Sequence, residues 1–367
     1  MPARMDGAIG MTSRRPVDGE EPIPDEVEGR VTSRPARRSV DGEEWISQEV
    51  EGILTRGLHD HFGRQVRIVE LHSRFLDDMV STHPISRLHL TLDSGKQLTV
   101  IFKRLQPRPD RDVRRRILIH RRLLADERLD APTVYASVCD EAQGRYWLFL
   151  EDVGEYNKLS WCGIDAWLAT FRWLARMHAA YYGREEELRA LGCLGEHRPA
   201  FYRFFAHAAN DVLQQYAQQH QLARFEGLMR RWFDISVAHL ARGSRTLVHG
   251  DSYEHNFMVQ PGLRIRPIDW DSAAIGVAGW DVAQLAAGWG PDRPHLVGVY
   301  LDEFAQHATV PLDRRAFDRT LAHCEIMRVL QVLYWWEGPY DDLWFVDHLL
   351  DEMESACHHL DSEGRDS

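Results

Sequence analysis

The stretch Leu247-Val248-His249-Gly250-Asp251-Ser252-Tyr253-Glu254-His255-Asn256 decides how this chain is interpreted, together with Ile268-Asp269-Trp270-Asp271 further on. The two segments place an Asp, an Asn five residues later and a second Asp beyond a short turn. Phosphoryl transfer from a magnesium-bound nucleotide needs such a set, because one carboxylate orients the acceptor hydroxyl and two oxygen ligands hold the metal. Each residue alone is typical of a turn, but the ordered set indicates this chemistry.

The residues between the two segments predict how the set comes together. Residues 257–268 form two short apolar runs around the turn dipeptide Pro261-Gly262, a pattern that predicts a β-hairpin. Asn256 begins the first strand and Asp269 follows the second, so both lie at the open end, with Asp251 in the loop just before. We therefore expect Asn256 and Asp269 to share a Mg²⁺ ion, whose other ligands are phosphate oxygens.

The composition is that of an ordinary soluble globular protein. Of 367 residues, 44% are hydrophobic and 27% are charged, so the chain can bury a large core and is long enough for two lobes. The net charge of -12 argues against a nucleic-acid partner, which needs a basic face, and is compatible with a cationic small molecule. With no apolar run of transmembrane length and no apolar signal core, we expect a cytoplasmic protein without a membrane partner.

The start of the chain contains a partial repeat. The motif VDGEE occurs at residues 17–21 and again at residues 40–44, but Pro22 follows the first copy and Trp45 follows the second. Since proline disfavours a helix there, we predict a disordered tail over residues 1–39.

The remaining residues change from a strand pattern to a helix pattern. Alternating apolar residues predict strands at 66–71, 87–92, 98–103, 133–136 and 146–150. Helical spacing predicts helices at 44–58, 111–125, 165–182, 199–218, 222–242, 293–307, 314–336 and 341–359. We therefore predict an α+β chain: an antiparallel-sheet N-lobe over residues 40–150, a mainly helical C-lobe with catalytic loop and acceptor site over 151–360, and a disordered tail over 361–367.

The motifs resemble those of the aminoglycoside phosphotransferase and choline kinase superfamily, which implies a two-lobed protein-kinase-like fold. The resemblance follows the family's order from about residue 65 to 285. It rests on His249-Gly250-Asp251 with Asn256, on Ile268-Asp269-Trp270-Asp271 and on Gly279-Trp280-Asp281-Val282-Ala283. Weaker matches are Val100-Ile101-Phe102-Lys103, Leu150-Glu151-Asp152-Val153 and Leu174-Ala175-Arg176-Met177-His178-Ala179.

The resemblance also implies roles. Asp251 would be the catalytic base, Asn256 and Asp269 the metal ligands, and Lys103 would bind the α- and β-phosphates of ATP or GTP. Asp281 would order the loop that carries Asp251, which is the catalytic loop.

The resemblance implies three further residues that contact the nucleotide, and it leaves the role of one acid open. The backbone of Glu151 and Val153 would meet the base of the nucleotide. No GxGxxG motif is present, so Ser81 in the loop 79–86 is the predicted phosphate contact in its place. The role of Asp271 stays open.

The helix after Lys103 departs from the family pattern. Arg116 and Leu118 stand where we expect the acid that pairs with the lysine. The remaining candidates for that acid are Asp112, Asp126 and Glu127. The absence of Asp-Phe-Gly and of a glycine-rich loop argues against a protein kinase.

The segment YWWEGPYDD at residues 334–342 combines aromatic rings with carboxylates. Such a combination attracts ammonium groups, so we predict Trp336, Glu337 and Tyr340 as acceptor contacts. The other interpretation places Tyr334 and Trp335 in a helix core.

The leading hypothesis is an ATP-dependent phosphotransferase that moves the γ-phosphoryl group to a hydroxyl of an aminoglycoside, an amino alcohol or a sugar-like molecule. The alternative is a pseudokinase that binds nucleotide or another ligand without turnover, because the helix acid is missing. The sequence leaves the acceptor and the oligomeric state open.

Overall fold

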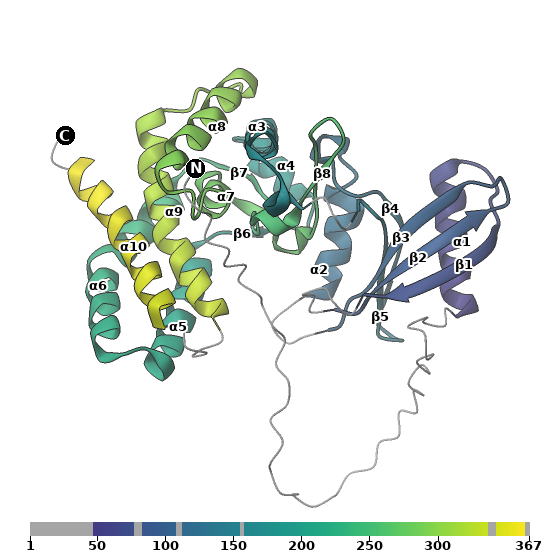
Figure 1. Ribbon diagram of the computed structural model, residues 1–367, viewed down its shortest axis with the longest axis horizontal. Helices are drawn as coiled ribbons and strands as arrows, with labels where there is room; N and C mark the ends of the chain where they lie inside the picture. Colours follow the sequence, from purple (N-terminus) through teal and green to yellow (C-terminus); the bar gives the residue numbers. More distant parts are fainter. Residues whose placement is uncertain (1–46, 77–82, 108–111, 155–157, 337–342, 364–367) are drawn as a thin grey trace, which may run out of the picture. The chain divides into compact units, whose positions relative to one another are not determined.

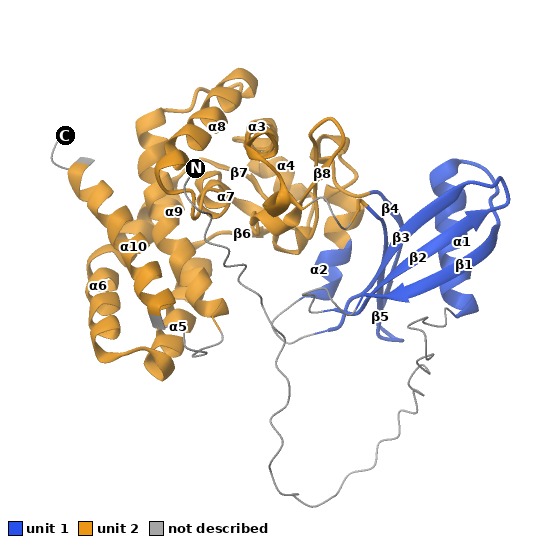
Figure 2. Cartoon of the chain, in the orientation of Figure 1, with its two compact units in different colours: residues 1–117, 133–152 blue, residues 118–132, 153–367 orange. Residues whose placement is uncertain are grey.

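The computed structural model describes residues 47–76, 83–107, 112–154, 158–336 and 343–363 (Figure 1). Several sequence-based predictions lie outside the described residues: the tail 1–39, Ser81, Glu337, Tyr340 and, of the predicted tail 361–367, residues 364–367. Residues 361–363 of that predicted tail are helical instead, because they continue the last helix, Leu343–Glu363. The chain forms two compact units, one of residues 1–117 with 133–152 and the other of residues 118–132 with 153–367 (Figure 2).

The first unit contains a five-stranded antiparallel sheet with strand order β1-β2-β3-β5-β4. Its elements are α1 (Gln48–Phe62), β1 (Ile68–Phe75), β2 (Ile85–Leu92), β3 (Gln97–Arg104), α2 (Val113–Leu118), β4 (Val134–Asp140) and β5 (Arg145–Glu151). The hairpin predicted from residues 87–103 is present, since β2 pairs with β3 and Leu90 lies opposite Leu98. The antiparallel sheet of the predicted fold is therefore confirmed.

Helix α1 packs on one face of this sheet (Figure 1). Leu54 and Leu58 of the helix are fully buried and belong to one apolar cluster with Val100 and Phe102 of β3. Burying each such leucine stabilises the fold by about 1.5–3 kcal/mol. Gly57 permits the close approach, because a Cβ atom there would lie 2.1 Å from the carbonyl oxygen of Tyr135 in β4.

The helix predicted at residues 111–125 is not a single α-helix. After α2 the chain makes a π-helical turn at Ile119–Leu123. Ile117 packs in an apolar cluster of the sheet, whereas Ile119 and Leu123 pack in the core of the second unit. The wider turn changes which side chains face each cluster, and the apolar spacing of the sequence does not reveal that change.

The second unit is mainly helical, as predicted. Its helices are α3 (Ile164–Tyr181), α4 (Glu185–Ala190), α5 (Pro199–Tyr216), α6 (Gln219–Arg242), α7 (Gly279–Leu285), α8 (Arg293–His307), α9 (Arg314–Trp335) and α10 (Leu343–Glu363). Its strands are β6 (Gly195–Glu196), β7 (Arg245–Val248), β8 (Phe257–Gln260), β9 (Arg264–Pro267) and β10 (Ala274–Val277), arranged as a sheet β6-β10-β7 and a hairpin β8-β9. Among the described residues, no helix is both long and apolar enough to span a membrane.

Helix α9 lies at the centre of this unit and contacts α5, α6, α7 and α10. From Leu321 to Leu333 almost all of its residues are buried. Three of its polar side chains, His323, Arg328 and Gln331, are therefore buried as well. Buried polar groups are stable only when they find hydrogen-bond partners, so these three residues mark places where α9 is joined to its neighbours by more than apolar packing.

His323 makes the stability of this unit sensitive to acid. Its ring is fully buried between α6 and α9, with Nδ1 2.9 Å from the Ser236 hydroxyl. Burial, together with the nearby His239, lowers the pKa of His323 to about 3. The folded state disfavours the protonated ring. The contribution of neutral His323 to the free energy of unfolding is therefore complete above pH 6.5 and is lost as the pH falls from 6.5 toward 3.

We expect the unfolding free energy to fall by up to about 1.4 kcal/mol per pH unit below pH 6.5 from this residue alone. Urea denaturation of the wild type and of His323→Gln between pH 7 and pH 5 measures the slope. We expect the unfolding free energy of His323→Gln to change less steeply with pH than that of the wild type. Equal pH dependence in the two proteins would show that His323 is not the cause.

Candidate active site

The hairpin predicted from Pro261-Gly262 is present. Strands β8 and β9 are antiparallel, with Phe257 opposite Pro267. At the open end, the backbone N–H of Ile268 donates a hydrogen bond of 2.8 Å to the carbonyl oxygen of Asn256. The hairpin therefore brings Asn256 next to the residue that precedes Asp269.

Asn256 also holds Asp251. Its amide Nδ2 donates to the Asp251 carbonyl oxygen at 2.9 Å and to the Asp251 carboxylate oxygen Oδ2 at 3.0 Å. Burial of the Asp251 carboxyl, and then the nearby Asp269 carboxylate, raise the pKa of Asp251. The three side chains that the sequence picked out are thus neighbours, and two of them carry like charges that a cation would stabilise.

Asp269 extends from a tight turn in the left-handed region of backbone space, with φ 58° and ψ 55°. Asp tolerates this conformation better than most residues, at a cost of about 1 kcal/mol. The turn is fixed by Trp270, whose fully buried indole donates a hydrogen bond of 3.2 Å to the Pro267 carbonyl. The burial of this tryptophan sets the direction in which Asp269 leaves the hairpin.

The loop that carries Asp251 lies directly against this turn. Gly250 has φ +83°, and a Cβ atom there would lie 2.3 Å from the Ser272 carbonyl oxygen. Only glycine fits this conformation and this contact. The two motif segments are consequently packed backbone to backbone.

Asp281 of α7 holds the loop from the other side. Its carboxylate accepts hydrogen bonds from the backbone N–H groups of His249 at 2.7 Å and Gly250 at 2.9 Å, and from His178 Nε2 at 3.1 Å. Burial alone opposes ionisation of Asp281, but hydrogen bonding and charge from His178 outweigh it and lower the pKa of the carboxyl. The Tyr300 hydroxyl lies 2.8 Å from His178 Nδ1 and fixes that ring. These contacts agree with the structural role inferred for Asp281.

Two site residues were missed by the sequence analysis. Gln284 of α7 and Gln331 of α9 are buried and hydrogen-bonded to each other, and Gln284 also bonds the loop around Asp251. The only local signal for Gln284 is a polar residue inside the apolar run 282–287, a pattern that does not name its partner.

The predicted nucleotide contacts lie partly in the first unit. Lys103 of β3 pairs with Ile85 of β2 and Leu148 of β5. Glu151 ends β5, and its carboxylate accepts hydrogen bonds from the backbone and hydroxyl of Thr133 at 3.1 and 3.0 Å. The predicted contact Val153 belongs to the second unit and is buried.

Two of the three candidate acids for Lys103, Asp112 and Asp126, have other contacts, and the third, Glu127, is exposed. The Asp112 carboxylate accepts from the backbone N–H of Arg115 at 3.1 Å. Asp126 lies in the second unit, where Arg128 lowers the pKa of its carboxyl to about 2. Arg116, at the position where an acid was expected, is buried against His83.

The predicted acceptor residues are described only at Trp336, which is half-buried with its ring 6.0 Å from that of Tyr216. Its neighbour Trp335 is 39% exposed, so the interpretation of Trp335 as a core residue is wrong. Tyr334 packs edge-on against Phe204 of α5, with ring centroids 5.3 Å apart. The exposed aromatic surface of α9 therefore centres on Trp335.

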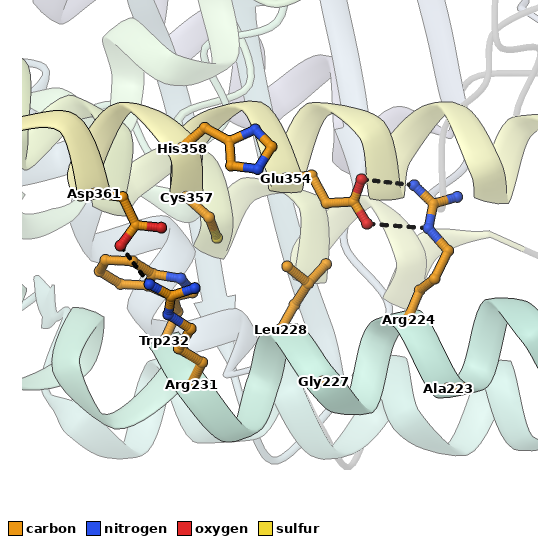
Figure 3. Close-up of a pocket in the computed structure, with 10 residues that line it drawn as sticks. All are labelled: Ala223, Arg224, Gly227, Leu228, Arg231, Trp232, Glu354, Cys357, His358 and Asp361. Atoms are coloured by element: carbon orange, nitrogen blue, oxygen red, sulfur yellow. Dashed lines mark hydrogen bonds and ion pairs between the residues drawn. The ribbon is translucent and has the colours of Figure 1, made fainter.

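A cavity of about 290 Å³ lies elsewhere, between α6 and α10 (Figure 3). Its charged side chains face one another, with Arg224 bonded to Glu354 and Arg231 to Asp361. None of the residues that line it belongs to the loop that carries Asp251.

A sequence model of the phosphotransferase enzyme family matches residues 86–317. The chain belongs to this family. Membership of this family supports small-molecule phosphotransferase activity. Among curated protein sequences, none matches the chain.

Solved structures of the same fold include three small-molecule kinases. An ethanolamine kinase from Plasmodium vivax is 12% identical over 78% of this chain and 82% of its own, with a TM-score of 0.52. An aminoglycoside phosphotransferase from Alicyclobacillus acidocaldarius is 13% identical over 77% and 91%, with a TM-score of 0.51. A microcompartment-associated aminopropanol kinase is 17% identical over 78% and 90%, with a TM-score of 0.50. At these identities the likeness shows the fold, and it confirms the predicted protein-kinase-like architecture.

Proposed function

We propose that this phosphotransferase moves the γ-phosphoryl group of ATP or GTP to a hydroxyl of a small molecule. The observation that supports the proposal is the arrangement of Asp251, Asn256 and Asp269 at the open end of the β8-β9 hairpin. Asp251 orients the acceptor hydroxyl and accepts its proton as the new P–O bond forms, while the bond from the γ-phosphorus to the bridging oxygen breaks and ADP or GDP leaves. Asp281 and Gly250 keep the loop in the conformation that presents this carboxylate.

The residues fit a Mg²⁺ ion. Asn256 uses its amide protons to hold Asp251, which leaves its Oδ1 for a metal. The Asp269 carboxylate is near enough to raise the pKa of Asp251, so a divalent cation would offset a repulsion that the fold contains. Mg²⁺ prefers oxygen ligands of these types and, when bound, neutralises charge on the phosphate oxygens. Lys103 would hold the remaining phosphates.

For the acceptor, we propose a molecule that carries an amine as well as the hydroxyl. The exposed rings of Trp335 and Phe204 offer faces that attract a cation, and the net charge of -12 favours a cationic ligand. Trp335 lies four residues after Gln331, so both are on one side of α9, and Gln331 is bonded to the residues around the catalytic loop. Two of the kinases with the same fold are named for amino alcohols.

The test is transfer of radiolabelled γ-phosphoryl from ATP to a panel of amino alcohols, aminocyclitols and neutral sugars. We expect EDTA to abolish transfer. Asp269→Asn keeps an oxygen ligand but loses a charge, so we expect it to need about 10–100 times more Mg²⁺ for half-maximal rate. Asp234→Asn, a change at an exposed position of α6, is the matched control and keeps the wild-type Mg²⁺ dependence.

The second candidate function is a pseudokinase, and one observation favours it. Arg116 is buried at the helix position where family members carry the acid for the lysine. A pseudokinase binds Mg-ATP but transfers phosphate to none of the acceptors. If no acceptor is phosphorylated and Asp251→Asn binds Mg-ATP as tightly as the wild type, the pseudokinase function replaces the proposed one.

A further inference from the structure

Two buried glutamine side chains connect helix α9 to the catalytic loop. Gln284 of α7 is 1% exposed and Gln331 of α9 is 7% exposed. The Gln284 amide Nε2 donates to Gln331 Oε1 at 2.8 Å. The residues are 47 positions apart in the chain, so the bond is a tertiary contact between two helices.

The Gln284 amide holds the peptide groups on both sides of Asp251. Its Oε1 accepts from the backbone N–H of Ser252 at 2.7 Å, and its Nε2 donates to the Gly250 carbonyl at 3.2 Å. These two groups belong to the peptide bonds that flank Asp251. Fixing both planes fixes the backbone of Asp251 and the direction in which its side chain leaves.

The same three bonds determine the orientation of the Gln284 amide. An oxygen must face the Ser252 N–H, and the two amide protons must face the carbonyl of Gly250 and Oε1 of Gln331. Glutamate has the same shape but would place a second oxygen against these two acceptors. Gln284→Glu is therefore a nearly isosteric change that converts two attractive contacts into repulsive ones.

Helix α9 holds a second point of the loop, at Tyr253. The Tyr253 hydroxyl donates to Gln331 Oε1 at 3.4 Å. Arg328, one helical turn earlier, lies beside the same phenol and is paired with Glu352 of α10. Burial raises the pKa of Tyr253, so the hydroxyl keeps its proton and remains a donor.

We infer that Gln284 and Gln331 are positioning residues for phosphoryl transfer, which act by fixing the orientation of the Asp251 carboxylate. The inference rests on the proposed function. Displacing a catalytic group by about 1 Å costs about 10²-fold in rate, so the glutamine pair affects kcat. Neither glutamine is a proposed ligand of nucleotide or metal, so the KM for ATP is unaffected.

The experiment compares Gln284→Glu, Gln331→Met and Gln331→Glu in the full-length protein. We expect Gln284→Glu and Gln331→Met to lower kcat by about 10–100-fold with the KM for ATP unchanged. Gln331→Glu keeps an oxygen that accepts from Gln284 and Tyr253, so it recovers most of the kcat that Gln331→Met loses. Gln306→Met, at an exposed position of α8, is the matched control and keeps the wild-type kcat.

A second readout does not depend on turnover. Hydrogen exchange of the Ser252 amide is expected to be slow in the wild type and faster in Gln284→Glu, because its acceptor is disturbed. Wild-type kcat and unchanged exchange in Gln284→Glu would overturn the inference. A lower kcat that Gln331→Glu fails to restore would also overturn it, because the acceptor oxygen would then be irrelevant. If the wild type transfers phosphate to no acceptor but its Ser252 exchange depends on Gln284, the proposed function fails and the loop contact stands.

Discussion

Replacing Asp251 with asparagine is expected to lower kcat by about 10²–10⁴-fold, the range that a positioned general base contributes. Asparagine keeps the shape of the side chain and an oxygen that can accept from Asn256, but it cannot take the proton of the acceptor hydroxyl. The substitution removes one of the two neighbouring negative charges, those of Asp251 and Asp269, so we expect the fold to stay intact. Initial rates with an acceptor that the wild type phosphorylates, together with calorimetric binding of Mg-ATP, measure the two effects separately.

The control for this variant is Asp234→Asn, which removes the same charge from an exposed position of α6. Its rate is expected to equal that of the wild type. If Asp251→Asn turned over the same acceptor as fast as the wild type, another residue would have to act as the base.

The hairpin at the site was predictable because its determinants are local. A Pro261-Gly262 turn between two short apolar runs fixes which ends of the chain meet, whatever surrounds them. The hydrogen bond from Ile268 to Asn256 follows directly from that register. Proximity of Asn256 and Asp269 was therefore a consequence of sequence spacing alone.

The contacts that hold the loop were not predictable in the same way. The partner of Gln284 lies 47 residues away, and no periodicity in either segment encodes the pairing. The small sheet β6-β10-β7 was missed for a related reason. Its strands have two to four residues, too few to show an alternating pattern. Strands this short are stable only because the surrounding tertiary structure packs against them.

The exposure of Trp335 and of Trp336 is a third feature that the sequence does not predict. Trp335 is the last residue of α9, whereas Trp336 is its C-cap and has an extended backbone, so helical spacing does not extend to both residues. The exposure of Trp335 depends on the rotation of α9, which is set by buried residues along the helix such as Gln331 and Leu333.

Removing the Asp281 side chain is expected to destabilise the second unit strongly. The carboxylate is fully buried and accepts from two backbone N–H groups and from His178. In Asp281→Ala those donors stay buried without an acceptor, and each buried donor left unsatisfied costs about 1–3 kcal/mol, so we expect a loss of about 3 kcal/mol or more. Urea denaturation at pH 7 measures the loss, and the rate of phosphate transfer should fall with it because the loop at His249 and Gly250 is released.

Asp313 provides a control with the same chemistry in a different setting. Its carboxylate also accepts from two backbone N–H groups, those of Arg315 at 2.9 Å and Ala316 at 3.3 Å, as the N-cap of α9, but Asp313 is exposed. Water replaces the lost acceptor in Asp313→Ala, so we expect a loss of only about 1 kcal/mol. Equal losses for the two variants would mean that Asp281 acts as an ordinary backbone cap. A loss that is several times larger for Asp281 would show that burial strengthens the contribution of its hydrogen bonds to the loop at His249 and Gly250.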